Sequence, residues 1–214
     1  MYDSDSWLEY PEHHKWFNKL WLAEELGHLC GPAGINVPEK GYYIVRPIYN
    51  LVGMGAGATR QWLVPENNAL SPGYFWCEEF RGKHYSIDYE WYVDKPPFWR
   101  PIVSYRGLLE PFSLSKFTSW IKVDYSIPLS SMFYELSNVG KINVECIDDK
   151  IIEIHLRPNP DPGDDITYDE LVPIWQDDYN KSIPSFLEQG YKWVDSYDDA
   201  DGELRNPRVG FFVR

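Results

Sequence analysis

Apolar and polar residues alternate most clearly between residues 142 and 157, where two short runs flank an acidic turn and predict a β-hairpin. A three-residue loop at 148–150 pairs Glu145 with Glu153 and gathers the apolar side chains on the opposite face, whereas a two-residue loop would mix the two sets. Burial of one apolar face therefore favours the three-residue loop. In this register the polar face carries Asn143, Glu145, Glu153, His155 and Arg157.

Two carboxylates that face each other across this hairpin repel, which costs up to about 1 kcal/mol on a sheet. A divalent cation bound by carboxylate oxygens would offset the repulsion, and Mg2+ commonly combines one or two protein carboxylates with nucleotide phosphates. The alternative is a solvated face on which Arg157 or a lysine neutralises Glu145 and Glu153. The hairpin by itself leaves both interpretations open.

Helical spacing of apolar residues recurs in three places. Residues 16–28 form an amphipathic pattern that ends at a Gly-Pro pair, and a second helix is expected from Pro128 to about Asn138. A third helix is expected near 182–190. Residues 1–14 are mostly polar and are expected to form an arm.

Further strands are predicted by apolar runs bounded by turn residues. They lie at 42–47, 60–64, 74–80, 84–89 and 208–213. The segment 91–127 is crowded with aromatic residues and prolines, and we expect a partly structured insert or short strands there. No internal repeat or low-complexity linker divides the chain, so one compact unit is the simplest organisation.

The composition limits the partners. The chain has 214 residues and a formal net charge of -13, and phosphate-rich polymers require clustered Lys and Arg, so nonspecific binding of nucleic acid or anionic membranes is not expected. Aromatic residues make up 17% of the chain, which indicates large buried aromatic surfaces or flat binding surfaces.

The cysteines and the N-terminus bear on the compartment. Cys30, Cys77 and Cys146 are odd in number and lack paired spacing, so we expect reduced thiols in a cytoplasmic protein. No apolar run approaches the roughly 20 residues that span a bilayer, and the acidic start of the chain is unlike a signal peptide.

A glycine-rich segment at 53–58 follows a predicted strand whose last member is Arg46. Glycine at alternate positions lets backbone N–H groups approach a ligand and form an anion-binding nest. Many glycine-rich segments are only hairpin tips, but a cation seven residues before this one favours a phosphate site. The acidic end of the strand at 74–80 would suit an adenine slot, although an ordinary hairpin is the alternative.

Several short segments follow one another between about Asn18 and Arg157. They are Asn18-Lys19-Leu20, the Gly-Ile-Asn-Val-Pro run at 34–38, Ile44-Val45-Arg46-Pro47, the glycines at 53–58, the segment 77–87, Asn143-Val144-Glu145, and 152–158. In this order and spacing they resemble the ATP-grasp superfamily of carboxylate–amine and carboxylate–thiol ligases.

The resemblance implies an α+β fold in which two α+β subdomains clasp a nucleotide between antiparallel sheets, with ATP and Mg2+ as cofactors. It divides the chain into an arm at 1–15 and one unit at 16–214, with a nucleotide-covering part at about 40–90, the aromatic insert at 91–127 and a metal-binding hairpin with the C-terminal part at 128–214. It implies that nucleotide is bound by Lys19, Arg46, Gly53, Gly55, Gly57, Glu78, Glu79, Phe80 and His84. It further implies a metal site at Glu145, Glu153 and His155, and catalytic roles for Arg157 and His155.

The chain departs from the family pattern at three positions. Arg46 stands where the family has a lysine, and a guanidinium still clamps phosphate. His84 replaces a ribose-binding glutamate, and His155 replaces a metal-binding asparagine. Imidazole is a poorer ligand for Mg2+ than oxygen is. Of the metal-binding positions that the resemblance implies, the one at His155 therefore departs most from the family pattern.

The resemblance implies a ligase that joins small-molecule or peptide carboxylates to amines or thiols through an acyl-phosphate. Only an arm precedes Lys19, so the acceptor site is expected from the aromatic insert, the C-terminal 50 residues, a homodimer or another partner chain, or is absent. The alternatives are a non-catalytic nucleotide-binding or scaffold protein of the same shape and, from the charge alone, an acidic protein that mimics nucleic acid.

Overall fold

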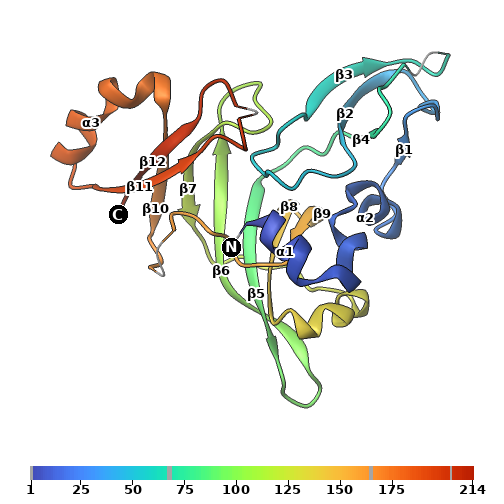
Figure 1. Ribbon diagram of the computed structural model, residues 1–214, viewed down its shortest axis with the longest axis horizontal. Coiled ribbons are helices and arrows are strands. Elements are labelled where there is room, and N and C mark those ends of the chain that lie inside the picture. The colour runs from blue at the N-terminus through green and yellow to red at the C-terminus, as the bar shows by residue number, and fades with distance from the viewer. Residues whose placement is uncertain (1, 67–68, 164–165, 203) are drawn as a thin grey trace.

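The computed structural model describes residues 2–66, 69–163, 166–202 and 204–214. Two antiparallel sheets carry most of the regular structure, and short helices pack beside them, which places the protein in the α+β class (Figure 1). Among the helices of these residues, none has the length and apolar content that crossing a bilayer requires.

The smaller sheet has four strands in the order β1-β4-β2-β3. Its strands are β1 (Cys30–Pro32), β2 (Gly41–Pro47), β3 (Thr59–Leu63) and β4 (Tyr74–Glu78). The strands expected at 42–47, 60–64 and 74–80 are confirmed in outline. The glycine-rich segment joins β2 to β3, at the end of the sheet where Arg46 lies.

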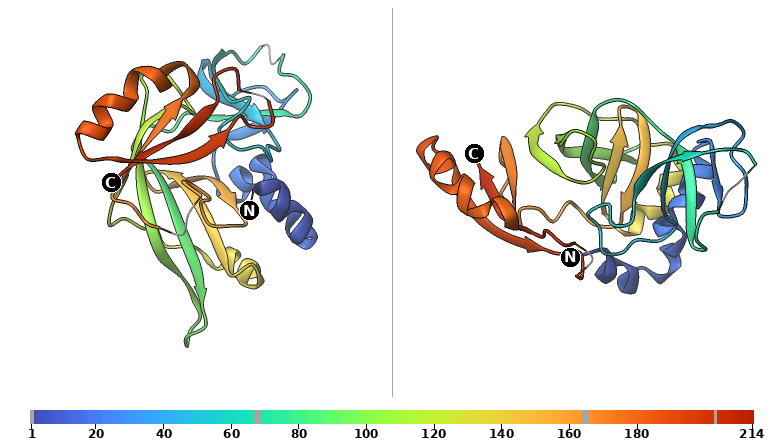
Figure 2. Two further views of the ribbon diagram at one scale, coloured as in Figure 1. Left: turned by 60° about the vertical axis from the view of Figure 1, so that its left-hand side comes forward. Right: turned by 90° about the horizontal axis from the view of Figure 1, so that it is seen from above.

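The larger sheet has eight strands in the order β11-β12-β10-β7-β6-β5-β8-β9. Its strands are β5 (His84–Tyr92), β6 (Phe98–Leu109), β7 (Phe117–Lys122), β8 (Lys141–Ile147), β9 (Lys150–His155), β10 (Glu170–Trp175), β11 (Lys192–Asp198) and β12 (Arg208–Val213). Strands β10 to β12 and α3 (Tyr179–Glu188) stand to one side of the other elements (Figure 2).

The segment 91–127 is more regular than its sequence indicates. It contains the end of β5, the twelve-residue β6 and β7, all in the larger sheet. Proline normally disfavours a central strand. Here Asp88 pairs with Val103 and Tyr89 pairs with Pro101, so the extra residue Ile102 forms a bulge that lets the proline fit.

The expected helix at 16–28 is divided in two. A 3-10 helix, η1 (Pro11–Phe17), comes first, and α2 (Lys19–Glu25) starts anew because the Asn18 side chain accepts a hydrogen bond from the Trp21 N–H at 2.9 Å. The expected arm folds onto the protein as α1 (Asp3–Glu9) and η1. The segment after Pro128 forms a 3-10 helix, η2 (Ser131–Asn138), and a third, η3 (Gln176–Asp178), precedes α3.

The hairpin of β8 and β9 confirms the pairing of Glu145 with Glu153 but not the expected loop. Ile147 pairs with Lys150, so the turn has two residues. Cys146 pairs with Ile151, and Ile152 is left as a bulge that restores the alternation of the two faces. A two-residue turn and a separated apolar face are therefore compatible.

The main core lies on the apolar face of this hairpin and of β5. Helices η1, α2 and η2 cover that face with large side chains, including the buried Trp16, Leu22 and Phe133. The opposite face of β5, β8 and β9 carries the polar residues and is directed toward the smaller sheet's loops. Burial of the first face thus fixes which side chains the second face presents.

Candidate functional site

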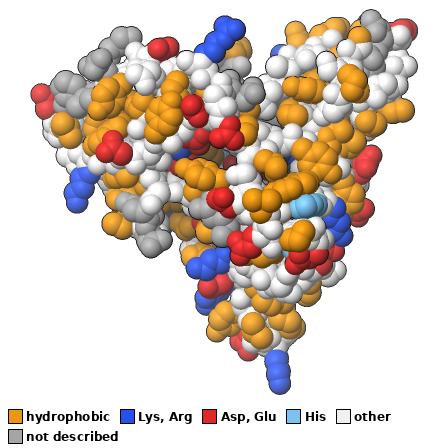
Figure 3. Space-filling model, viewed as in Figure 1, with side chains coloured by type: hydrophobic (Ala, Val, Ile, Leu, Met, Phe, Trp, Pro, Cys, Tyr) orange, Lys and Arg blue, Asp and Glu red, His pale blue; other side chains and the backbone are white. Residues whose placement is uncertain are grey.

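One cavity of about 720 Å3 is lined by residues of both sheets. Figure 3 shows acidic side chains beside the hollow between the part formed by β1 to β4 and the part formed by β10 to β12 and α3. The lining includes these residues expected from the sequence: Lys19, Arg46, Gly53, Gly55, Glu78, Glu79, Phe80, His84, Glu145, Glu153, His155 and Arg157. Gly57 is not among the lining residues; a Cβ added there would lie 3.2 Å from Pro47 Cδ and 3.2 Å from the Tyr74 hydroxyl oxygen.

Glu145, Glu153 and His155 form a compact group on the polar face of the hairpin. One ligand atom from each lies within 4.8 Å of the others. His155 Nε2 is 3.9 Å from Glu145 Oε1 and 3.9 Å from Glu153 Oε1. Two carboxylates and an imidazole are a chemically suitable donor set for a divalent cation, and the imidazole widens the choice beyond Mg2+ to ions such as Mn2+ and Zn2+.

A lysine and a second histidine also contact the two glutamates. Lys19, the first residue of α2, places Nζ 2.6 Å from Glu153 Oε1, and its side chain is only 7% exposed. His84, the first residue of β5, places Nε2 3.2 Å from Glu145 Oε2. A lysine therefore does neutralise Glu153, as the alternative interpretation of the hairpin requires, but the face is largely buried and not solvated as that interpretation expects.

Asp3 joins the group from α1, although nothing in its polar surroundings in the sequence predicts this. Its carboxylate is buried; Oδ2 lies 2.8 Å from His155 Nδ1 and Oδ1 lies 2.9 Å from Arg157 Nε. The expected arm therefore contributes to the site. An acidic residue that pairs across 152 positions leaves no local pattern by which sequence inspection could find it.

Burial and charge together set the protonation of these groups. Burial alone lowers the pKa of His155, but the Asp3 carboxylate, its hydrogen bond and the nearby Glu145 outweigh it and raise that pKa to about 10. Burial by itself would raise the pKa of Glu145, but the neighbouring His155 and His84 reverse this and hold it well below its usual value. Without a metal ion, His155 is thus an imidazolium between carboxylates at neutral pH.

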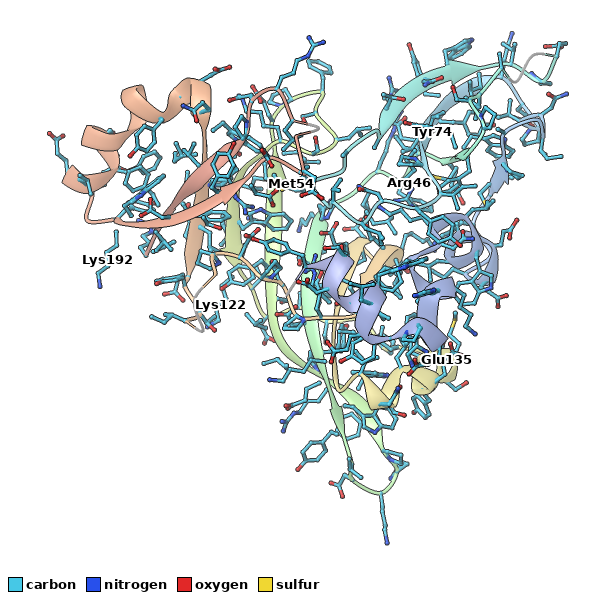
Figure 4. All side chains as sticks on the ribbon, in the orientation of Figure 1. Arg46, Met54, Tyr74, Lys122, Glu135 and Lys192 are labelled. Atoms are coloured by element: carbon cyan, nitrogen blue, oxygen red, sulfur yellow. The ribbon has the colours of Figure 1, made fainter. Side chains whose placement is uncertain are left out.

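Arg46 and the glycine-rich segment, which contains Met54, both line the cavity, and Figure 4 labels these two residues. The Arg46 guanidinium donates from Nη2 to the carbonyl of Ile152 at 2.8 Å, a carbonyl that the hairpin bulge presents. Gly55 has φ +63, and a Cβ there would lie 2.9 Å from Ser115 Cβ. The segment therefore reaches across to the loop between β6 and β7, and only glycine allows that approach.

The acidic end of β4 is tied into the smaller sheet. Glu78 Oε1 accepts from the Leu29 N–H at 2.8 Å, and Glu79 pairs with Arg60 at 2.6 Å. The Phe80 ring packs edge-on against His28, with 4.8 Å between ring centroids. These residues line the cavity, while both carboxylates already have protein partners.

The far wall of the cavity comes from the C-terminal strands, which lie within the C-terminal 50 residues named above as one possible source of the acceptor site, although the sequence singles out no residue there. Arg208 is buried and binds Asp161 through two hydrogen bonds of 2.6 and 2.7 Å. Its guanidinium also packs over the Phe211 ring at 4.5 Å. The neighbouring lining residues are mainly apolar, and they include Trp120, Leu171, Pro173 and Trp175.

Comparison with known proteins assigns no family. No protein-family model and no curated protein matches the chain. A crystal structure from Archaeoglobus fulgidus, described provisionally as an ATP-grasp superfamily protein, aligns with a TM-score of 0.39 and 13% sequence identity over 66% of this chain. The alignment spans 46% of that protein, less than half its length, and a likeness of this size does not establish a shared fold.

Proposed function

We propose that this chain is an ATP- and magnesium-dependent ligase of the ATP-grasp type, which joins a carboxylate to an amine or thiol through an acyl-phosphate. One observation carries the proposal: a single cavity brings the glycine-rich segment and two cations, Lys19 and Arg46, to the opposed glutamates Glu145 and Glu153. Phosphoryl transfer requires little from a protein beyond positioning and charge stabilisation, and this arrangement supplies both.

In this proposal the nucleotide lies between the two sheets. The phosphates are placed beneath Gly53 and Gly55, near Lys19 and Arg46, and the adenine is placed against the cavity wall at 78–80. His84, at the entrance to β5, is placed beside the ribose. Glu145, Glu153 and His155 would hold the metal ion, which when bound would offset the charge of the phosphates.

A substrate carboxylate oxygen then attacks the γ-phosphorus, ADP leaves, and an acyl-phosphate forms. The nitrogen or sulfur of the second substrate attacks the acyl carbon, phosphate leaves, and the nucleophile's proton passes to solvent. In this proposal Arg157, which lines the cavity, stabilises the acyl-phosphate. No protein nucleophile takes part.

The acceptor is proposed to bind at the C-terminal wall. Leu171, Pro173, Trp175 and Phe211 line this part of the cavity together with the Arg208–Asp161 pair. A mainly apolar lining with a fixed ion pair suits a small molecule or peptide end that carries both apolar and charged groups. A second copy or a partner chain is the other source that we propose for the acceptor site.

The second candidate is a nucleotide-binding or scaffold protein that does not ligate. Its support is the pairing within the site, since Lys19 contacts Glu153 at 2.6 Å and Asp3 contacts Arg157 at 2.9 Å. A site whose charges already neutralise one another needs no ligand for stability. ATP turnover separates this candidate from the ligase.

The first test is thermal unfolding with ATP and Mg2+. Ligand binding to the folded state raises the melting temperature, and about 100-fold excess over Kd adds roughly 2.7 kcal/mol. We expect Glu153→Gln to remove most of the shift and the exposed control Glu25→Gln to retain it. Absence of any shift with any nucleotide rejects both candidates, while a shift without ADP release over a broad panel of carboxylates and amines favours the scaffold.

A further inference from the structure

The two nitrogens of His155 have different surroundings. Nδ1 lies 2.8 Å from Asp3 Oδ2, while Nε2 faces Glu145 and Glu153, each with a carboxylate oxygen 3.9 Å away. Histidines that bind metals commonly donate one ring N–H to a carboxylate, which fixes the tautomer and directs the other nitrogen at the ion. The ring of His155 is held in this way.

Asp3 is held in place from several sides. Its residue is 3% exposed, and its second carboxylate oxygen lies 2.9 Å from Arg157 Nε. The helix that carries it is anchored by Trp7, whose ring stacks on His14 at 3.6 Å and whose carbonyl lies 2.7 Å from His14 Nε2. A carboxylate fixed by such packing can orient an imidazole, whereas a mobile side chain could not.

We infer that Asp3 is a positioning residue that acts through His155 on a divalent-cation site formed with Glu145 and Glu153, and that this imidazole makes the site prefer Mn2+ or Zn2+ to Mg2+. The inference rests on the metal site of the proposed function and deepens it by naming the class of ion and the residue that orients its nitrogen ligand. His155 would hold the ion through Nε2 only after that nitrogen has released its proton to solvent, and the Nδ1 proton would remain in the hydrogen bond to Asp3.

The test measures metal binding by the full chain without nucleotide. Mn2+ is titrated and free Mn2+ is followed by electron paramagnetic resonance, and Mg2+ and Zn2+ are then added as competitors. We expect the parent to bind Mn2+ more tightly than Mg2+ and Asp3→Asn to bind Mn2+ about 10- to 100-fold more weakly. Glu9→Gln, at the exposed end of the same helix, is the matched control and should bind as the parent does.

A second variant tests the preference of the site for one ion over another. His155→Asn replaces the imidazole by an amide oxygen, and we expect it to lower the ratio of Mn2+ to Mg2+ affinity. An unchanged ratio overturns the assignment of His155 as the residue that selects the ion.

Asp3→Asn leaves the buried Arg157 without its carboxylate partner, so circular dichroism must first show that the variant is folded. A second measurement, made on the parent protein, does not depend on whether that variant folds. In histidine labelled with nitrogen-15, Zn2+ should shift the Nε2 resonance of His155 while the Nδ1–H signal persists. Coordination through Nδ1 overturns the inference.

The remaining outcomes separate the role of Asp3 from the metal site of the proposed function. A folded Asp3→Asn variant with Mn2+ affinity within twofold of the parent overturns the role of Asp3 alone. Tighter binding by that variant shows instead that Asp3 competes for the site, and it also overturns the inference. No binding of Mn2+, Zn2+ or Mg2+ by the parent overturns both the inference and the metal site of the proposed function.

Discussion

The ion pair between Lys19 and Glu153 gives the sharpest prediction about stability. The two side chains are 7% and 14% exposed, and the atoms lie 2.6 Å apart. Lys19→Met keeps most of the side-chain volume but leaves a nearly buried carboxylate without its closest cation. Removing one partner of a fully buried pair costs about 3–5 kcal/mol. Because His155 Nε2 remains 3.9 Å from Glu153 and the pair is not fully buried, we expect a loss at or below the lower limit of that range, about 2–3 kcal/mol.

For a chain of this size each kcal/mol corresponds to about 2–4 °C, so the melting temperature of Lys19→Met should fall by about 4–12 °C. Urea unfolding followed by tryptophan fluorescence measures the same loss as a free energy of unfolding. The control is Lys15→Met, whose pair with Glu135 is 48% and 39% exposed and should contribute about 0–1 kcal/mol.

The double variant Lys19→Met with Glu153→Gln tests the cause. It removes the stranded charge, so we expect it to recover at least half of the stability that Lys19→Met loses. The reasoning is refuted if Lys19→Met is no less stable than Lys15→Met, or if the double variant recovers nothing.

Three further predictions concern the core, the glycine-rich segment and a thiol. Phe133→Ala, at a 1% exposed core position, should lower the free energy of unfolding by about 3–5 kcal/mol in urea, whereas Phe112→Ala at a fully exposed position should change it by less than about 0.5 kcal/mol. Gly55→Ala should weaken the ATP-induced melting shift more than Gly53→Ala, because both have positive φ but only at Gly55 would the added Cβ lie within 3 Å of another atom, Ser115 Cβ; equal effects would contradict a role for the contact with the β6–β7 loop. Burial and nearby carboxylates raise the pKa of Cys146 to about 12, so iodoacetamide at pH 8 should label it far more slowly in the folded protein than in urea, and equal rates by mass spectrometry would contradict its burial.

The sequence predicts the site hairpin well because its two faces differ in polarity. The pairing of Glu145 with Glu153 follows from keeping the apolar set together, whatever the loop. The loop that the sequence predicts is wrong, because a bulge at Ile152 has the same effect on the alternation as a longer turn. Bulges carry no pattern of their own, so only the structure distinguishes the two solutions.

The parts that the sequence missed depend on distant contacts. The aromatic segment forms β6 and β7 because the bulge at Ile102 accommodates a proline that would otherwise argue against a central strand. Asp3 and Arg208 reach the cavity from near the two ends of the chain, and each gains its place from partners that are remote in sequence. Local periodicity finds strands and helices, and it does not show which of their polar residues meet.

A crystal structure with a non-hydrolysable ATP analogue and Mn2+ tests the central claim most directly. The account predicts a triphosphate beneath the segment 53–57 and an anomalous Mn2+ peak bound by Glu145 and Glu153, two residues that pair across β8 and β9. A nucleotide bound outside this cavity, or a cavity that stays free of nucleotide and metal at saturating concentrations, would contradict it.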